Sequence, residues 1–297
     1  MFGYRTDGIN VSKTLDPMVL FTPLIMPTRC ESMNNVIYPA EYEPMANYIR
    51  QQRVQGNNIS FQTIMAAAFV RTLKKYPYLN YFVMGKRVFS HRDICLSLIV
   101  LRDTPDGSIK EAAVKVYCDP DDTIKDIARK FEEQVSIAKK VTESNGTADF
   151  AGALLRIPVL PNLVVLLARA LDRLGILPRR LERISPFHCS MFITNMMSIG
   201  LPAIHHHLYN FGTCSIFLSL GKPERQTVTS GGQAVRRLMI PMGIVTDERI
   251  CGGAEYAMGV HAFLQYLQHP ELLELTPAEE EARKAVAACD NVTPISG

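Results

Sequence analysis

The sequence predicts an α+β fold in which helices pack on a mixed β-sheet in two layers. Helix-like and strand-like segments are clustered along the chain and do not strictly alternate, which disfavours a doubly wound parallel sheet. Hydrophobic residues make up 47% of the 297 residues and charged residues 21%, which is typical of a chain that buries a core. No glycine-rich loop of the dinucleotide or P-loop type is present, because Gly231-Gly232 lacks the required spacing.

Four helices are predicted from apolar residues that recur at helical spacing. They span residues 42–54, 60–76, 124–141 and 254–268. Ser60 is a suitable N-cap for the second helix, and Pro77 ends it.

Short runs rich in branched and aromatic residues predict the strands. They lie at residues 94–101, 112–117, 190–194, 213–220 and 238–245. Gly85-Lys86 predicts a hairpin between residues 81–84 and 87–89, and the glycine-rich stretch 226–232 predicts a second hairpin tip. Residues 20–26, which Pro23 interrupts, are interpreted as an edge strand.

The chain is interpreted as one domain at residues 20–275, with an N-terminal arm at 1–19 and a C-terminal tail at 276–297. An apolar helical insertion lies at about residues 151–183. Its uninterrupted apolar run is only Leu163–Ala168, far short of the roughly 20 residues needed to span a bilayer. We expect protein to cover this amphipathic helix. Contact with a membrane surface, aided by the arginines of the segment, is the less favoured alternative.

The charge and the cysteine content of the chain limit which partners and which cellular compartment are expected. The net charge of +3 arises from 32 basic and 29 acidic residues that are interspersed, so no nucleic-acid partner is predicted. The seven cysteines form no C-x-x-C pair and are interpreted as free thiols in a reducing compartment. Because the first residues also lack an apolar signal core, a cytoplasmic location is expected. No metal site and no permanently bound cofactor are predicted.

The most informative stretch is Thr246-Asp-Glu-Arg-Ile-Cys-Gly-Gly-Ala254. It connects the predicted strand 238–245 to the predicted helix 254–268. Acidic, basic and glycine residues therefore lie at a strand-to-helix turn, where a functional group can project from a rigid frame.

Four segments in order resemble the chloramphenicol acetyltransferase fold, which is shared with the catalytic domain of the acyltransferase components of 2-oxo acid dehydrogenase complexes. They are ISFQTIMAAAFVRTLKKYPYLNYFV, DTPDGSIKEAAVKV, MFITNMMSIG and TDERICGGA. The resemblance covers about residues 20–275. The run 204–212, IHHHLYNFG, and the sequence Asp-Glu-Arg are similar to a stand-alone bacterial subgroup. Since no lipoyl-carrying or subunit-binding segment is visible, we do not expect membership of a dehydrogenase complex.

The resemblance implies a two-layer sandwich, a homotrimer and active sites between subunits. It implies acyl transfer from a coenzyme A thioester, as co-substrate, to a small-molecule acceptor. The histidine that serves as base in the family is replaced here by Glu248, and the aspartate of the family motif is replaced by Gly252. Thr194 falls where the family has a hydroxyl that stabilises the oxyanion.

Each of these positions has a second interpretation. Glu248 has a reference pKa of about 4.3, far from the value that suits a base at neutral pH, so this turn is interpreted either as an altered base or as an inactive turn. Thr194 could instead bond to local backbone.

The adjacent histidines His205, His206 and His207 cannot share one face of a strand or helix, so together they do not predict a metal site. His206 or His207 is a candidate replacement for the missing base; the alternative is a structural loop or trimer interface. His188 next to Cys189 is a candidate catalytic pair only if a third group orients it.

The sequence therefore predicts a divergent acyltransferase-like protein with Glu248, Thr194, His206 and His207 as candidate catalytic residues. The alternative is a catalytically inactive protein of the same fold that binds ligands or assembles complexes. A membrane-associated subunit that uses residues 151–183 is a third possibility.

Overall fold

The computed structural model describes residues 4–103, 109–140 and 159–290. Its main sheet is mixed and has the strand order β2-β10-β8-β7-β5-β6, with β9 paired to β10 outside this path. Strands β5, β7 and β8 run parallel, whereas the other pairs are antiparallel. The bounds are β2 Met33–Glu41, β5 Ile94–Asp103, β6 Ile109–Cys118, β7 Met191–Asn195, β8 Ile216–Leu220, β9 Glu224–Ser230 and β10 Gln233–Asp247.

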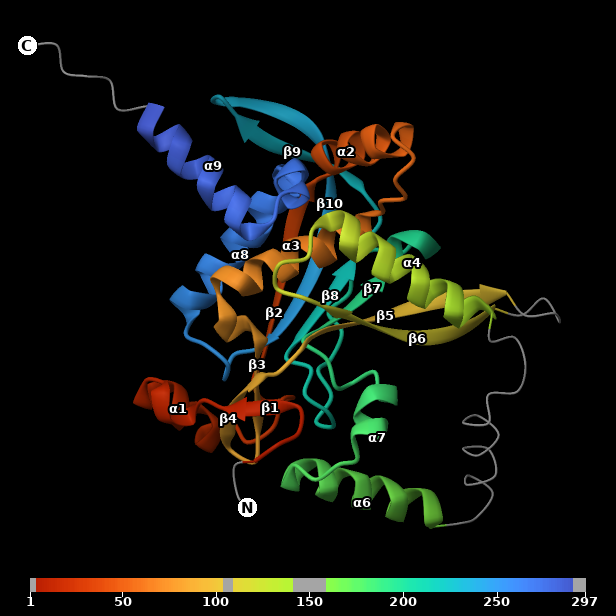
Figure 1. The fold of residues 1–297 in the computed structure, drawn as a ribbon, viewed down its shortest axis with the longest axis vertical. Coiled ribbons are helices and arrows are strands. Elements are labelled where there is room, and N and C mark those ends of the chain that lie inside the picture. Colours follow the sequence, from red (N-terminus) through yellow and green to blue (C-terminus); the bar gives the residue numbers. More distant parts are fainter. Residues whose placement is uncertain (1–3, 104–108, 141–158, 291–297) are drawn as a thin grey trace, which may run out of the picture.

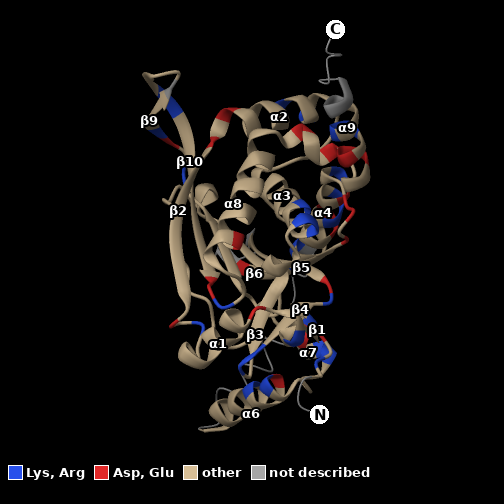
Figure 2. Cartoon of the chain, turned by 90° about the vertical axis from the view of Figure 1, so that its left-hand side faces the viewer, with Lys and Arg blue, Asp and Glu red and all other residues tan. Residues whose placement is uncertain are grey.

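Four helices cover one face of this sheet (Figures 1 and 2). They are α2 Tyr42–Val54, α3 Phe61–Lys75, α4 Ile124–Lys140 and α8 Gly253–Gln268. The core between helices and sheet includes Ile64, Leu96, Ile127 and Leu218, each 0–1% exposed. Side chains alternate along the strands, so Leu96 and Leu98 face the helices while Cys95 belongs to a second cluster with Phe192 and Phe217.

Helix α3 begins where the sequence predicts, because Ser60 caps it. The Ser60 hydroxyl accepts a hydrogen bond from the Thr63 amide at 3.1 Å, and the Thr63 hydroxyl bonds back to the Ser60 amide at 3.3 Å. These bonds satisfy backbone donors that have no partner inside the helix. Eleven consecutive residues from Thr63 to Leu73 are buried, so α3 is the central helix of the layer.

A smaller sheet of β1 (Gly8–Asn10), β4 (Arg87–His91) and β3 (Tyr81–Met84) lies at the end of the molecule that also holds α1 (Pro17–Ile25), α6 (Leu160–Leu174) and α7 (Arg179–Ile184) (Figure 1). The remaining elements are short or terminal: η1 Ser12–Thr14, η2 Pro77–Asn80, η3 Met196–Ile199, η4 Pro270–Glu274 and α9 Pro277–Asp290.

The α+β class, the four predicted helices and both hairpins are confirmed. The edge strand predicted at residues 20–26 is wrong, since this segment belongs to helix α1. The Asp16 carboxylate accepts a hydrogen bond from the Met18 amide at 2.7 Å, and Pro17 occupies the first helical turn. A capped start and a proline with helical φ favour the helix over an extended chain.

The predicted insertion at 151–183 lies partly outside the described residues, because 141–158 are not described. Its described part consists of α6 and α7. Helix α6 is strongly amphipathic, yet most of its leucines are exposed in the single chain; Leu163 and Leu167 are each 57% exposed. The domain boundaries at 19/20 and 275/276 stay predictions.

Candidate functional site

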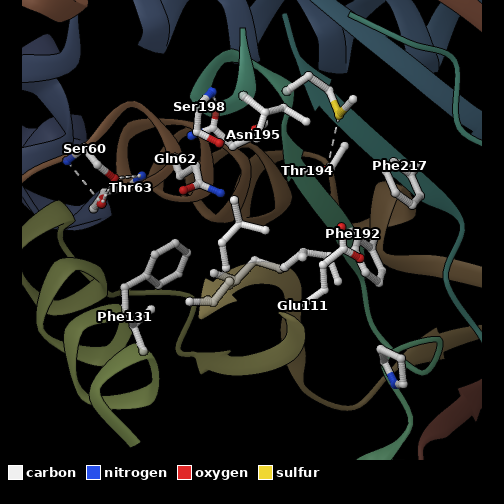
Figure 3. Close-up of a pocket in the computed structure, with 18 of the residues that line it drawn as sticks. Ser60, Gln62, Thr63, Glu111, Phe131, Phe192, Thr194, Asn195, Ser198 and Phe217 are labelled. Atoms are coloured by element: carbon white, nitrogen blue, oxygen red, sulfur yellow. Dashed lines mark hydrogen bonds between the residues drawn. The ribbon is translucent and has the colours of Figure 1, made fainter. Parts of the chain in front are cut away.

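One candidate site is a cavity of about 1020 Å³ beyond the carboxyl end of β7 (Figure 3). It is bounded by the start of α3, by α4, by β5 and β6, and by the segments around Phe187 and His206. Thr194 and His206, two of the predicted site residues, line this one cavity although the chain separates them by a folded loop. Its volume is at the upper end of the range for small-molecule sites.

Thr194 lies near the end of β7, which is flanked by β5 and β8 and is therefore held on both sides. Alternation along the strand puts Thr194 on the same side as Phe192, and both side chains are drawn in the cavity in Figure 3. The Thr194 hydroxyl donates to the Met196 sulfur at 3.8 Å. A thioether is a weak acceptor, so the hydroxyl can turn to a more strongly accepting ligand oxygen.

A second donor comes from α3 on the cavity wall. The Gln62 side-chain nitrogen is buried and has no hydrogen-bond partner among the described residues. A buried amide N–H without a hydrogen-bond partner destabilises the folded protein, and a ligand oxygen that accepts a hydrogen bond from it would remove this cost. Gln62 was not predicted from the sequence, because no local pattern shows that its side-chain amide is buried without a partner.

His206 belongs to a stack of three rings. Its imidazole lies 4.1 Å from the Phe217 ring at an interplanar angle of 2°, and Phe217 lies 4.8 Å from Phe192 at 9°. The His206 Nδ1 lies 3.3 Å from the backbone oxygen of His207. Because a carbonyl oxygen can only accept, Nδ1 carries the proton, and in the neutral ring Nε2 is left with the lone pair that a general base needs.

The loop that carries His206 is fixed against the sheet. The Ser219 hydroxyl donates to the Ile204 oxygen and accepts from the Ile204 amide at 3.1 Å. Gly243, on the neighbouring strand β10, permits this approach, because a Cβ there would lie 2.3 Å from the Ile204 oxygen. The His206 ring is therefore positioned by backbone packing that begins two residues before it.

The other two histidines of the run lie elsewhere. His205 and His207 are both exposed, and neither lines the cavity. The His207 ring contacts the rings of His206 and Tyr209, at 5.1 and 5.8 Å. Of the two histidines predicted as replacements for the base, the structure brings only His206 to Thr194.

Glu248 lies in a different cavity of the same chain, of about 320 Å³, between α1 and the start of α8. Its backbone amide donates to the Ser32 oxygen at 3.0 Å, while its side chain is exposed and makes no hydrogen bond or ion pair within the described part of the chain. The single subunit therefore does not bring Glu248 together with Thr194 and His206.

The residue before Glu248 anchors the turn. The buried Asp247 carboxylate accepts from Arg249 Nε and Nη2 at 2.7 Å each and from the Ser32 hydroxyl at 2.9 Å. Arg29 lies 3.8 Å from the same carboxylate. Arg249 also donates to the Met26 oxygen at 3.0 Å. The rigid part of the Asp-Glu-Arg motif is thus the ion pair between Asp247 and Arg249. This pair does not involve the side chain of Glu248.

Gly252 is the N-cap of α8 and has ordinary extended geometry, with φ of −72°. Its amide donates to the Glu255 carboxylate at 2.9 Å. The nearest atom to a Cβ built at Gly252 is the Glu255 oxygen, at 3.7 Å. A Cβ at this position would therefore make only an ordinary van der Waals contact.

The cysteines near these motifs are buried and poorly suited to nucleophilic chemistry. Burial raises the pKa of Cys251 to about 12, so its thiol stays protonated. His188 bonds to the Ser185 hydroxyl at 2.8 Å and lies 3.4 Å from the Asp172 carboxylate. Cys189, whose pKa burial also raises, bonds instead to Cys214. Within the described residues, the predicted pairing of His188 with Cys189 is not formed.

Solved structures share this architecture. A probable dihydrolipoamide acetyltransferase from Listeria monocytogenes has 13% sequence identity and a TM-score of 0.56, with coverage of 91% of this chain and 96% of that chain. The cubic core of the pyruvate dehydrogenase multienzyme complex has 16% identity and a TM-score of 0.57, with coverage of 90% and 92%. A chloramphenicol acetyltransferase has 11% identity and a TM-score of 0.50, with coverage of 88% and 99%.

The chain has the chloramphenicol acetyltransferase-like fold. The predicted fold class is thereby confirmed. No protein-family model matches the sequence, and no curated protein matches it either. At sequence identities of 11–16%, the similarity to these structures concerns the fold and does not identify a substrate for this chain.

Two further findings concern all the residues that the structure describes. No described helix combines the length and apolar character that crossing a bilayer requires. Among the residues with described positions, no three histidine, cysteine, aspartate or glutamate side chains come close enough to hold a metal ion.

Proposed function

We propose that the protein transfers an acyl group from a coenzyme A thioester to a small hydroxyl, amine or thiol acceptor. The observation that carries this proposal is the presence of Thr194 and His206 in one cavity, one with a hydroxyl donor and the other with an imidazole ring that can act as a base. These are the two functions that acyl transfer requires: stabilisation of an oxyanion and removal of a proton.

In the proposed reaction, His206 Nε2 takes the proton of the acceptor as its heteroatom attacks the thioester carbonyl. The carbonyl π electrons move to oxygen, and the Thr194 hydroxyl donates a hydrogen bond to the oxyanion. Collapse of the tetrahedral intermediate breaks the carbon–sulfur bond. The leaving thiolate takes the proton back from His206, so the base is regenerated and charge is balanced.

We further propose a homotrimer in which Glu248 of one subunit faces the cavity of the next. This arrangement is supported by the separation of Glu248 from Thr194 within one chain. It is also supported by the exposed Glu248 carboxylate, which has no partner among the described residues. One of the proteins of similar fold forms the cubic core of a multienzyme complex, so the architecture is compatible with assembly. In the trimer, the Glu248 carboxylate would stabilise the protonated His206 ring by charge attraction.

A catalytically inactive binding or assembly protein is the second candidate. It is favoured by the Asp247–Arg249 pair, which is satisfied inside the turn and presents no reactive group. It is also favoured by Gly252, which cannot supply the carboxylate of the family motif.

The two candidates are separated by acetyl-coenzyme A binding and turnover. We expect calorimetry to show binding, and release of free thiol to accelerate in the presence of a panel of small amine, alcohol and thiol acceptors. Thr194→Val and His206→Gln should each lower turnover by about 100-fold while binding is retained. His205→Gln, which alters an exposed ring outside the cavity, is the matched control and should have little effect.

Absence of binding of any coenzyme A thioester would exclude the acyl-transfer proposal. The second candidate would be favoured if acetyl-coenzyme A binds without turnover and if Thr194→Val and His206→Gln leave that binding unchanged. Light scattering tests the trimer independently, because a monomer at micromolar concentration would exclude an inter-subunit role for Glu248.

A further inference from the structure

A second cavity, of about 500 Å³, lies between α6 and the body of the molecule. Its walls come from the β3–β4 hairpin, from residues 27–29, from residues 210–211 and from α6. Five cationic side chains line it, and Asp172 is its one carboxylate: the cations are Arg29, Lys86, Arg169, Arg173 and Arg249. None of the residues proposed for acyl transfer lines this cavity.

Each buried charge of this cavity lies near a group of opposite charge. Arg249 is bonded to Asp247, and Arg29 lies 3.8 Å from the same carboxylate. Asp172 accepts a hydrogen bond from Arg5 Nη2 at 2.8 Å and lies 3.4 Å from His188. These groups therefore build a fixed wall and leave the three outer cations uncompensated.

Lys86, Arg169 and Arg173 are exposed and make no ion pair or hydrogen bond with another described residue. Arg169 and Arg173 are four residues apart on α6, where like charges repel and reduce helix stability. Figure 2 shows basic residues on α6 at the end of the molecule near β3. Three uncompensated positive charges around one cavity are a stable arrangement only when an anion occupies it or water screens it.

The orientation of α6 strengthens this argument. The helix turns Arg169, Ala170 and Arg173 toward the cavity, while Leu163 and Leu167 on its apolar face are mostly exposed. An amphipathic helix normally turns its apolar face to the protein. Here the Arg5–Asp172 ion pair holds the charged face inward, and a Cβ at Gly175 would lie 2.4 Å from the Tyr4 oxygen, so the end of α6 is packed closely on the N-terminal segment.

Lys86 is held in place by the β3–β4 hairpin. It lies at the tip of the hairpin with φ of +64°, and its neighbour Gly85 has φ of +58°. A two-residue hairpin turn of this type requires positive φ at both central residues, so the turn itself imposes this conformation on Lys86. The hairpin therefore places the lysine among the residues that line the cavity.

We infer that this cavity binds a phosphate-bearing anion through Lys86, Arg169 and Arg173. The planar guanidinium groups match phosphate oxygens in pairs, and the lysine supplies a point charge. Apolar side chains also line the cavity and suit an uncharged portion of the ligand: Val83, Met84, Leu166, Ala170 and Phe211. The phosphate can belong to a soluble phosphoester or to an anionic lipid headgroup, because the same side chains recognise both.

Titration calorimetry of the full chain with inorganic pyrophosphate and with adenosine diphosphate at low ionic strength tests the inference. We expect binding that weakens as salt increases, and a loss of affinity of at least about tenfold in the double variant Arg169→Gln/Arg173→Gln. Arg225→Gln/Arg236→Gln is the matched control, because it removes two exposed charges from the β9–β10 hairpin and should leave the affinity unchanged.

Lys86→Gly separates loss of charge from loss of fold. Glycine suits φ of +64°, so this variant should unfold at the same temperature as the parent or higher, and it should bind pyrophosphate more weakly by about threefold or more.

Flotation with phosphatidylglycerol and with phosphatidylcholine vesicles distinguishes the two sources of phosphate.

Binding to phosphatidylglycerol vesicles that depends on Arg169 and Arg173, without binding of the soluble probes, assigns the ligand to a lipid headgroup. Binding of the soluble probes alone assigns it to a phosphoester. If neither probe class binds, or if the control variant weakens binding as much as Arg169→Gln/Arg173→Gln does, the inference is wrong.

Discussion

Arg249 bonds both oxygens of the Asp247 carboxylate, with Nε–Oδ1 and Nη2–Oδ2 distances of 2.7 Å. The two residues flank Glu248, so a buried bidentate pair holds the backbone on both sides of an exposed side chain. The turn is therefore rigid whether or not Glu248 has a chemical role.

Asp247→Asn should destabilise the fold by about 3–5 kcal/mol, because it leaves Arg249 and Arg29 buried without a compensating charge. Glu248→Gln, at the exposed neighbouring position, should change the free energy of unfolding by less than about 0.5 kcal/mol. Urea unfolding of both variants measures the difference. Equal effects would show that the ion pair is not what anchors the turn.

Gly243→Ala should displace the loop that carries His206, since the new Cβ would lie 2.3 Å from the Ile204 oxygen. We expect a cost of about 1–3 kcal/mol and loss of the Phe217–His206 stack. Gly253→Ala is the matched control, because a Cβ there would meet no atom within 4 Å, and it should be nearly neutral. Thermal unfolding and the His206 imidazole resonances report the two effects. Tolerance of alanine at Gly243 would contradict the positioning by Ser219 and Gly243.

Restoration of the family motif tests what Glu248 and Gly252 have lost. In the double variant Glu248→His/Gly252→Asp, the Cβ of the aspartate meets no close contact at position 252, and histidine titrates near neutral pH. If the changes at positions 248 and 252 have made the protein inactive, as the second candidate holds, the restored base should raise acyl transfer from acetyl-coenzyme A by about 100-fold, which is typical of a general base. A folded trimer with no gain in turnover would show that the surrounding site is no longer arranged for acyl transfer.

The protein should become less stable as the pH falls into the mildly acidic range, because His91 is buried. Burial lowers the pKa of His91 to about 4, against the opposing effects of its hydrogen bond to the Asn80 oxygen at 2.9 Å and of the Asp7 charge. In the unfolded chain the ring titrates near 6.5. The unfolded state therefore takes up a proton first, and stability that is present above pH 6.5 is lost as pH falls toward 4, by about 3 kcal/mol.

His91→Gln keeps a hydrogen-bond donor for Asn80 and removes the titration, so its stability should depend less on pH between 4 and 6.5. Urea unfolding at several pH values and NMR titration of His91 measure this. The same pH slope in both proteins, or a His91 pKa near 6.5, would contradict the prediction.

Much of the architecture follows from local sequence. Ser60 caps α3, Gly85-Lys86 turns the β3–β4 hairpin, and alternation along β5 places Leu96 in the core. These features depend on neighbours a few residues away. The helix α1 was missed because the Asp16 cap and Pro17 outweigh the strand-like composition of residues 20–26.

The candidate sites depended on contacts between distant segments. Sequence resemblance pointed to Thr194 and Glu248, and the unusual histidine run pointed to His206 and His207. Only the tertiary structure separated His206 from His207, because Ser219 and Gly243 fix which ring reaches the cavity. Gln62 was not predicted, since nothing in the local pattern shows that its amide is buried without a partner.

The sequence by itself determined the fold class, the positions of most helices and strands, and the turn at residues 246–254. It could do so because periodicity, caps and turn residues act over one or two helical turns. The tertiary structure decided that Thr194 and His206 share a cavity, that Glu248 faces another, and that Lys86, Arg169 and Arg173 surround a third. Those juxtapositions arise from strand pairing and helix packing across the whole chain, which no local pattern encodes.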